Sequence, residues 1–125
     1  MNKNELEAFG QALIQQVRDY ALDDYLQIKS GDMKSAPARE LFRLIAGMRA
    51  EDKETLDRVV ENIINRTVHH VLFMFEQSED FTIVSKENIS SSIDLVEQSD
   101  GLSGELYGET GWFSKYSQNT HLNGK

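Results

Sequence analysis

Two adjacent histidines, His69 and His70, are the side chains in this sequence that are best suited to chemistry. Successive residues of a helix point about 100° apart, so two neighbouring imidazoles cannot easily face one metal ion. A zinc-binding helix instead places its histidines four residues apart. The chain has no cysteine, which excludes thiol nucleophiles and cysteine-ligated metals. We interpret His70 as a hydrogen-bonded histidine at the edge of the core and His69 as part of a polar face. We predict no catalytic residues, no metal site and no cofactor.

Acidic residues are concentrated between Glu76 and Thr110, where nine acids and one base, Lys86, give a net charge of −8. The rest of the chain has 12 acids and 12 bases and is neutral overall. Such acidity repels phosphate groups, which argues against nucleic acid and anionic membranes as partners. It permits a basic protein partner, although a solvated, solubilising surface is the simpler interpretation. A calcium loop is excluded, since the twelfth residue from Asp100 is Gly111 rather than a glutamate.

The stretch from residue 100 to 113 combines four glycines, three aromatic residues and three acids. Neither a strand nor a basic residue accompanies the glycines, as a phosphate loop would require. In one interpretation this stretch is a ribbon whose large apolar side chains cover the helical core. In the other, aromatic residues flanked by acids form a binding surface, the usual composition of an interface hot spot. The residues of that candidate surface are Glu97, Asp100, Glu105, Tyr107, Glu109, Trp112 and Phe113.

Apolar spacing of three and four residues predicts a first long helix that ends at Ser30-Gly31. Gly10 falls on its apolar face, which a close approach by another helix would explain. The pattern loses phase at Leu22, and this predicts a kink at Asp23-Asp24. The apolar stripe of this helix comprises Leu6, Phe9, Leu13, Val17, Tyr20 and Ala21.

A second helix is predicted to begin at Pro37, and a third, central helix spans residues 52–77. From Val68 to Phe75 the apolar side chains of the central helix point in several directions. That half must be covered either by the Trp112-Phe113 ribbon or by a second subunit. The apolar stripe of the central helix comprises Leu56, Val60, Ile63, Thr67, Val71 and Met74.

The predicted fold is mainly α, with three long helices in an antiparallel, bundle-like core. A short fourth helix near residues 88–96 and a small C-terminal β element complete it. We place that β element as a hairpin that pairs Leu106-Tyr107 with Trp112-Phe113. We predict one helical domain over residues 1–116 and a flexible tail over 117–125. The N-terminus lacks the features of a signal peptide, and no apolar run is long enough to span a membrane, so we expect a cytoplasmic protein.

The sequence does not determine a function. It favours a small acidic, non-enzymatic protein-binding module, such as an inhibitor or immunity-like protein, that acts on a basic partner through residues 76–113. The alternative is a self-associating structural or regulatory domain that forms a homodimer. A metal-dependent enzyme centred on His69 and His70 is the least favoured of the three, because spacing alone assembles no nucleophile, base and orienting group.

Overall fold

The structure is a computed structural model, and it describes residues 4–86 and 93–118. The fold is mainly helical with a small antiparallel sheet, as the sequence predicts. Among the elements, η1 is a π-helical turn and η2 is a 3-10 helix. In chain order the elements are α1 (Asn4–Leu13), η1 (Ile14–Arg18), α2 (Asp19–Ser30), α3 (Ala36–Ala46), α4 (Ala50–Gln77), β1 (Val84–Ser85), β2 (Ile93–Asp94), α5 (Leu95–Gln98), η2 (Leu102–Leu106) and α6 (Trp112–Tyr116).

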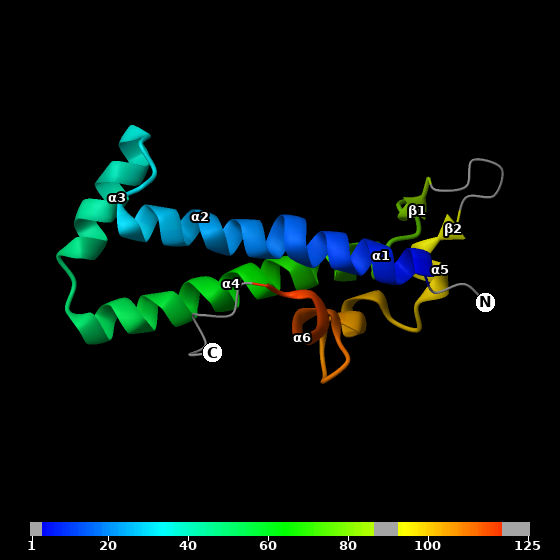
Figure 1. The fold of residues 1–125 in the computed structure, drawn as a ribbon. Helices are drawn as coiled ribbons and strands as arrows, with labels where there is room; N and C mark the ends of the chain where they lie inside the picture. The colour runs from blue at the N-terminus through cyan, green and yellow to red at the C-terminus, as the bar shows by residue number, and fades with distance from the viewer. Residues whose placement is uncertain (1–3, 87–92, 119–125) are drawn as a thin grey trace.

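Two long rods form the frame of the molecule. The first consists of α1, η1 and α2 in unbroken succession, and the second is α4, which runs alongside in the opposite direction (Figure 1). Helix α3 connects the rods at one end. Gly31 ends α2 with a left-handed φ of 85°, and the Ser35 side chain accepts a hydrogen bond from the backbone N–H of Ala38 to begin α3. Pro37 lies in the first turn, which confirms the predicted start of the second helix.

The predicted kink at Asp23-Asp24 is wrong, because α2 runs without interruption from Asp19 to Ser30. The change of phase arises earlier, in the π-helical turn, where wider hydrogen-bonded turns rotate every later residue relative to the preceding helix. The buried stripe of the first rod therefore differs from the predicted one. It comprises Leu6, Gly10, Ile14, Arg18 and Leu22, each four residues apart.

The structure has a two-stranded antiparallel sheet at another place than the sequence predicts, with Val84 paired to Asp94 and Ser85 to Ile93. The predicted hairpin across residues 106–113 is wrong, because Leu106 ends η2 and Trp112 begins α6. The chain reverses between them through Gly108, whose φ is 91°. Part of the predicted fourth helix is α5, which begins at residue 95, but Ile93 and Asp94 form strand β2 instead of helix; the stretch 87–92 lies outside the described residues.

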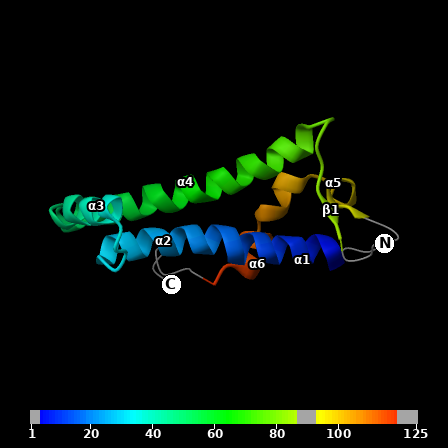
Figure 2. The same cartoon turned by 90° about the horizontal axis from the view of Figure 1, so that it is seen from above.

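The main core lies where the two rods diverge. Figure 2 shows the segment around η2 between the diverging ends of α1 and α4, and Figure 1 shows that it lies below these two helices. The C-terminal segment covers Val68 and Leu72 of the central helix and packs against Phe75, whereas Phe73 stays 43% exposed, so this cover accounts for part of the apolar half of α4. A smaller core of Leu22, Tyr25 and Ile45 lies under α3. The buried residues of the main core are Leu6, Ile14, Val68, Leu72, Leu95, Leu102, Leu106 and Trp112.

Candidate functional site

The strongest candidate site is a hollow of about 290 Å³ beyond the C-terminal end of α4. It combines aromatic walls with carboxylates that come from two segments far apart in the sequence. One segment is residues 75–82, and the other is residues 94–97. We call it the acidic hollow; its lining residues are Phe75, Ser78, Glu79, Asp80, Phe81, Thr82, Asp94, Val96 and Glu97.

Two capping side chains hold the walls of the acidic hollow. The Ser78 hydroxyl accepts hydrogen bonds from the backbone N–H groups of Asp80 and Phe81 at 3.0 and 2.9 Å, which fixes the turn that follows α4. Asp94 caps α5 by accepting from the Val96 N–H at 3.0 Å, and its same oxygen accepts from the Thr82 hydroxyl at 2.7 Å. The two segments are therefore joined, and the hollow is built on fixed backbone.

The carboxylates of the acidic hollow lack a cationic partner in the described part of the chain. Glu79, Asp80 and Glu97 are exposed, and none forms an ion pair with any described basic residue. Phe81 beside them is two-thirds exposed. Carboxylates bind guanidinium and ammonium groups through charge-assisted hydrogen bonds, and aromatic faces attract the same cations. This arrangement can therefore receive a lysine or arginine side chain.

A second surface feature surrounds Tyr107, on the loop between η2 and α6. Its hydroxyl lies 2.9 Å from Nδ1 of His69, and its ring contacts that of Phe113 at a centroid distance of 5.8 Å. The His69 ring in turn stacks on Phe73 at 6.0 Å. The predicted roles of the two histidines are therefore exchanged: His69 is the hydrogen-bonded, partly buried ring, and His70 is exposed.

Glu76 fastens η2 to the end of α4. Its carboxylate accepts hydrogen bonds from the backbone N–H of Ser103 at 2.9 Å and from the Ser103 hydroxyl at 2.8 Å. The bond from the backbone N–H has the largest effect on the pKa of Glu76, and the bond from the hydroxyl has the next largest. Together with the electrostatic attraction of His69 they outweigh the opposing effect of burial, so the pKa lies below its usual value of 4.5. The ionised form of Glu76 is therefore the one that the fold prefers.

This preference predicts how stability depends on pH. Because the pKa of Glu76 is lower in the folded than in the unfolded state, its contribution is complete above pH 4.5 and is lost as the pH falls through the folded value. Replacing Glu76 with glutamine should cost about 1 kcal/mol at pH 7, and the difference from wild type should shrink below pH 4.5. Urea unfolding at pH 7, 5, 4 and 3 measures both chains. A difference that stays constant over this range would contradict the assignment.

In the structure, the residues of the predicted binding surface lie in several separate places. Glu97 lines the acidic hollow, whereas Tyr107 and Phe113 contact each other on the second feature. Glu105 accepts a hydrogen bond from the Ser99 hydroxyl at 2.6 Å, and Asp100 and Glu109 are exposed. These residues do not form one continuous site, because the ribbon turns back on the first rod between them.

Trp112 belongs to the core. Only 1% of its surface is exposed, and its ring occupies the space above Gly10, where a Cβ atom would come within 2.3 Å of Cε2. The close approach that the sequence suggested at Gly10 is thus confirmed, and the approaching helix is α6. Trp112 therefore covers the core rather than contributing to a surface.

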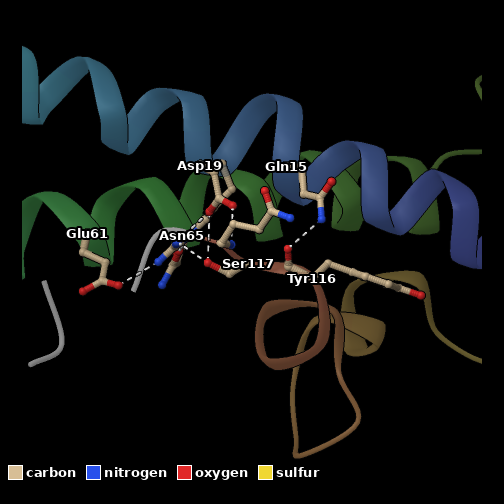
Figure 3. Close-up of polar contacts among 8 residues, drawn as sticks. Gln15, Asp19, Glu61, Asn65, Tyr116 and Ser117 are labelled. Carbon is tan, nitrogen blue, oxygen red and sulfur yellow. Dashed lines mark hydrogen bonds and ion pairs between the residues drawn. The ribbon is translucent and has the colours of Figure 1, made fainter. Parts of the chain in front are cut away.

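A buried polar network that the sequence analysis missed joins the C-terminal segment to both rods (Figure 3). The Arg18 guanidinium donates to Glu61 at 2.7 Å, to Asn65 and Asp19 at 2.9 Å, and to the Ser117 hydroxyl at 2.8 Å. The Gln118 N–H donates to the second oxygen of Asp19 at 2.7 Å. We call this the Arg18 network; it comprises Arg18, Asp19, Glu61, Asn65, Ser117 and Gln118.

The Arg18 network includes the first two residues of the predicted tail. Ser117 and Gln118 were predicted to begin a flexible tail, yet both are hydrogen-bonded; residues 119–125 lie outside the described part of the chain. A signal for the buried arginine was present, since Arg18 lies four residues from both Ile14 and Leu22. It passed unnoticed because the phase of the first helix was read without the π-helical turn.

Three general observations bear on function. Within residues 4–86 and 93–118, no three His, Asp or Glu side chains are grouped so as to hold a metal ion. No helix in those same ranges is both long and apolar enough to cross a membrane. Comparisons with family models, curated proteins and solved structures found no match.

Proposed function

We propose that this protein is a small, acidic, non-enzymatic binding module that takes a basic segment of another protein in its acidic hollow. The observation that carries the proposal is the group of Glu79, Asp80 and Glu97 around an aromatic hollow, with no described cation paired to them. Electrostatic attraction between such a surface and a basic partner speeds association and orients it. Phe81 adds apolar contact for the stem of a lysine or arginine.

A charge-reversal experiment tests this function. The variant Asp80→Lys/Glu97→Lys should bind a fluorescent arginine-rich peptide about 10-fold more weakly than wild type, because two favourable charge pairs become repulsive. The matched control, Glu40→Lys/Glu54→Lys, makes the same change in net charge at exposed positions of α3 and α4. It should stay within about twofold of wild type. Fluorescence anisotropy at low and high salt provides the measurement.

Equal weakening by the two variants would mean that only the overall negative charge attracts the peptide, and the acidic hollow would then have no specific role. The same pair of variants can be used to capture partners from the source cells. A partner retained by the control variant and lost by the variant in the hollow would support the proposal, and it would identify the basic protein concerned.

A further inference from the structure

The apolar stripes that the sequence places on the two long helices are largely uncovered by the fold. On the first rod, Val17 and Tyr20 are 52% and 65% exposed. On α4, Ile63, Val71 and Met74 are 56%, 43% and 53% exposed. Each rod therefore has a second apolar side besides the one that packs in the core. We call this side the paired-stripe face; it comprises Val17, Tyr20, Ile63, Thr67, Val71 and Met74.

The paired-stripe face contains both a hollow and a protruding side chain. An apolar hollow of about 150 Å³ lies between the rods, and every residue lining it belongs to one rod or the other. Tyr20, on the same face, projects most of its ring into solvent. A two-fold symmetric contact requires a surface that complements itself, so that a protruding group of one copy can enter a hollow of the other. The lining residues are Val17, Ala21, Ile63, Ile64, Thr67 and Val68.

Charge distinguishes this face from the acidic hollow. Residues 13–22 and 59–75 contain four Asp, Glu, Lys or Arg side chains. Three of them, Arg18, Asp19 and Glu61, belong to the Arg18 network, and the fourth is the exposed Arg66. Within those two stretches, both carboxylates are paired with Arg18. Two copies of this acidic chain can bring these faces together without mutual repulsion.

We propose that the protein dimerises through the paired-stripe face, so that the two rods of one copy and the two rods of a second copy form a four-helix bundle. Side chains exposed to this extent offer roughly 600 Å² per copy, and the total of about 1,200 Å² reaches the lower limit of specific interfaces. Homodimer interfaces are also more apolar than those of transient complexes, as this face is. The dimer does not depend on the function of the acidic hollow.

The mass of the protein in solution tests this proposal. Sedimentation from about 1 to 300 µM should show a species of twice the 14.3 kDa chain mass. Ile63→Lys should weaken dimerisation by more than about 100-fold, since it buries an unpaired ammonium group. Ile63 is half-exposed, so the variant should fold, which circular dichroism can verify. The control Leu44→Lys, at a more exposed apolar position on α3 outside the face, should remain dimeric.

A single cysteine provides a second readout, because the natural chain has none. With Thr67→Cys, maleimide labelling should slow as protein concentration rises, and Ile63→Lys should abolish that dependence. The proposal fails if the wild-type chain sediments at 14.3 kDa throughout, or if Leu44→Lys dissociates the dimer as Ile63→Lys does. It also fails if the chain stays monomeric and Thr67→Cys is shielded from maleimide only when an unrelated protein is added.

Discussion

Replacing Arg18 with alanine should lower the free energy of unfolding by about 4 kcal/mol. Arg18 is 4% exposed, and its guanidinium donates to Glu61, Asn65, Asp19 and Ser117. Its removal leaves carboxylates inside the protein without their cation, and an uncompensated buried charge is more costly than the loss of the hydrogen bonds themselves. Chemical denaturation at pH 7 measures the difference, with circular dichroism confirming that the variant folds.

Two further variants separate this explanation from a general effect of removing an arginine. Arg66→Ala, at an exposed position of α4, should change stability by no more than about 0.5 kcal/mol. Adding Glu61→Gln and Asp19→Asn to Arg18→Met should recover part of the loss, because the remaining groups are then neutral. If the triple variant were no more stable than Arg18→Met alone, carboxylates buried without their cation would not be the cause of the loss.

The Arg18 network also predicts which part of the chain Arg18→Ala should destabilise most. Ser117 and Gln118 reach the first rod through Arg18 and Asp19, and the Gln15 side-chain amide donates to the Tyr116 carbonyl at 3.1 Å. These bonds fix the end of α6 to η1. Faster amide exchange in residues 112–118 is therefore expected to accompany Arg18→Ala, while the small core under α3 keeps its protection.

Local signals were sufficient to predict the helical frame. Gly31 and Pro37 mark the end of α2 and the start of α3 in sequence and structure alike, because each acts through its own backbone geometry. The path of the C-terminal segment could not be predicted in this way. It depends on Trp112 meeting Gly10, a contact between residues a hundred positions apart that no local spacing specifies.

The sequence indicated which types of residue form the candidate site, but not which of them lie together in space. The excess of acids and the aromatic residues are visible in the composition, yet only Glu97 of the proposed residues lines the acidic hollow. Asp80 and Phe81 join it through the turn that Ser78 caps, which is a consequence of tertiary structure. The apolar stripes of the two long helices are visible in the sequence, but the sequence does not indicate which of their residues the core covers. Several of these residues face solvent in the structure.

Replacing Trp112 with alanine should lower the free energy of unfolding by about 4 kcal/mol, because it removes the largest side chain of the main core. Its ring contacts Phe9 edge-on at 6.0 Å and lies directly over Gly10. Calorimetry or denaturant titration measures the loss. Phe113→Ala provides a comparison on the same helix, and a smaller effect is expected there because Phe113 is only partly buried.

Gly10→Ala shows whether the contact with this ring is as close as the structure indicates. Alanine gains about 1 kcal/mol in helix propensity over glycine. A Cβ atom at Gly10, however, would lie 2.3 to 2.8 Å from three ring carbons of Trp112, so we expect a net loss of about 2 kcal/mol. The control Gly104→Ala, whose Cβ would meet no atom within 4 Å, should change stability by less than about 0.5 kcal/mol.

The double variant Gly10→Ala/Trp112→Ala distinguishes this steric cause from other causes. Once the ring is absent, the new methyl group occupies vacated space and only its gain in helix propensity remains. The double variant should therefore be slightly more stable than Trp112→Ala alone, and the two changes should be strongly non-additive. Additive losses would show that Gly10 is required for its backbone and not for the tryptophan. With coupling of the expected sign, the contact that holds the C-terminal segment against the first rod is the reason that a glycine occupies this position in α1.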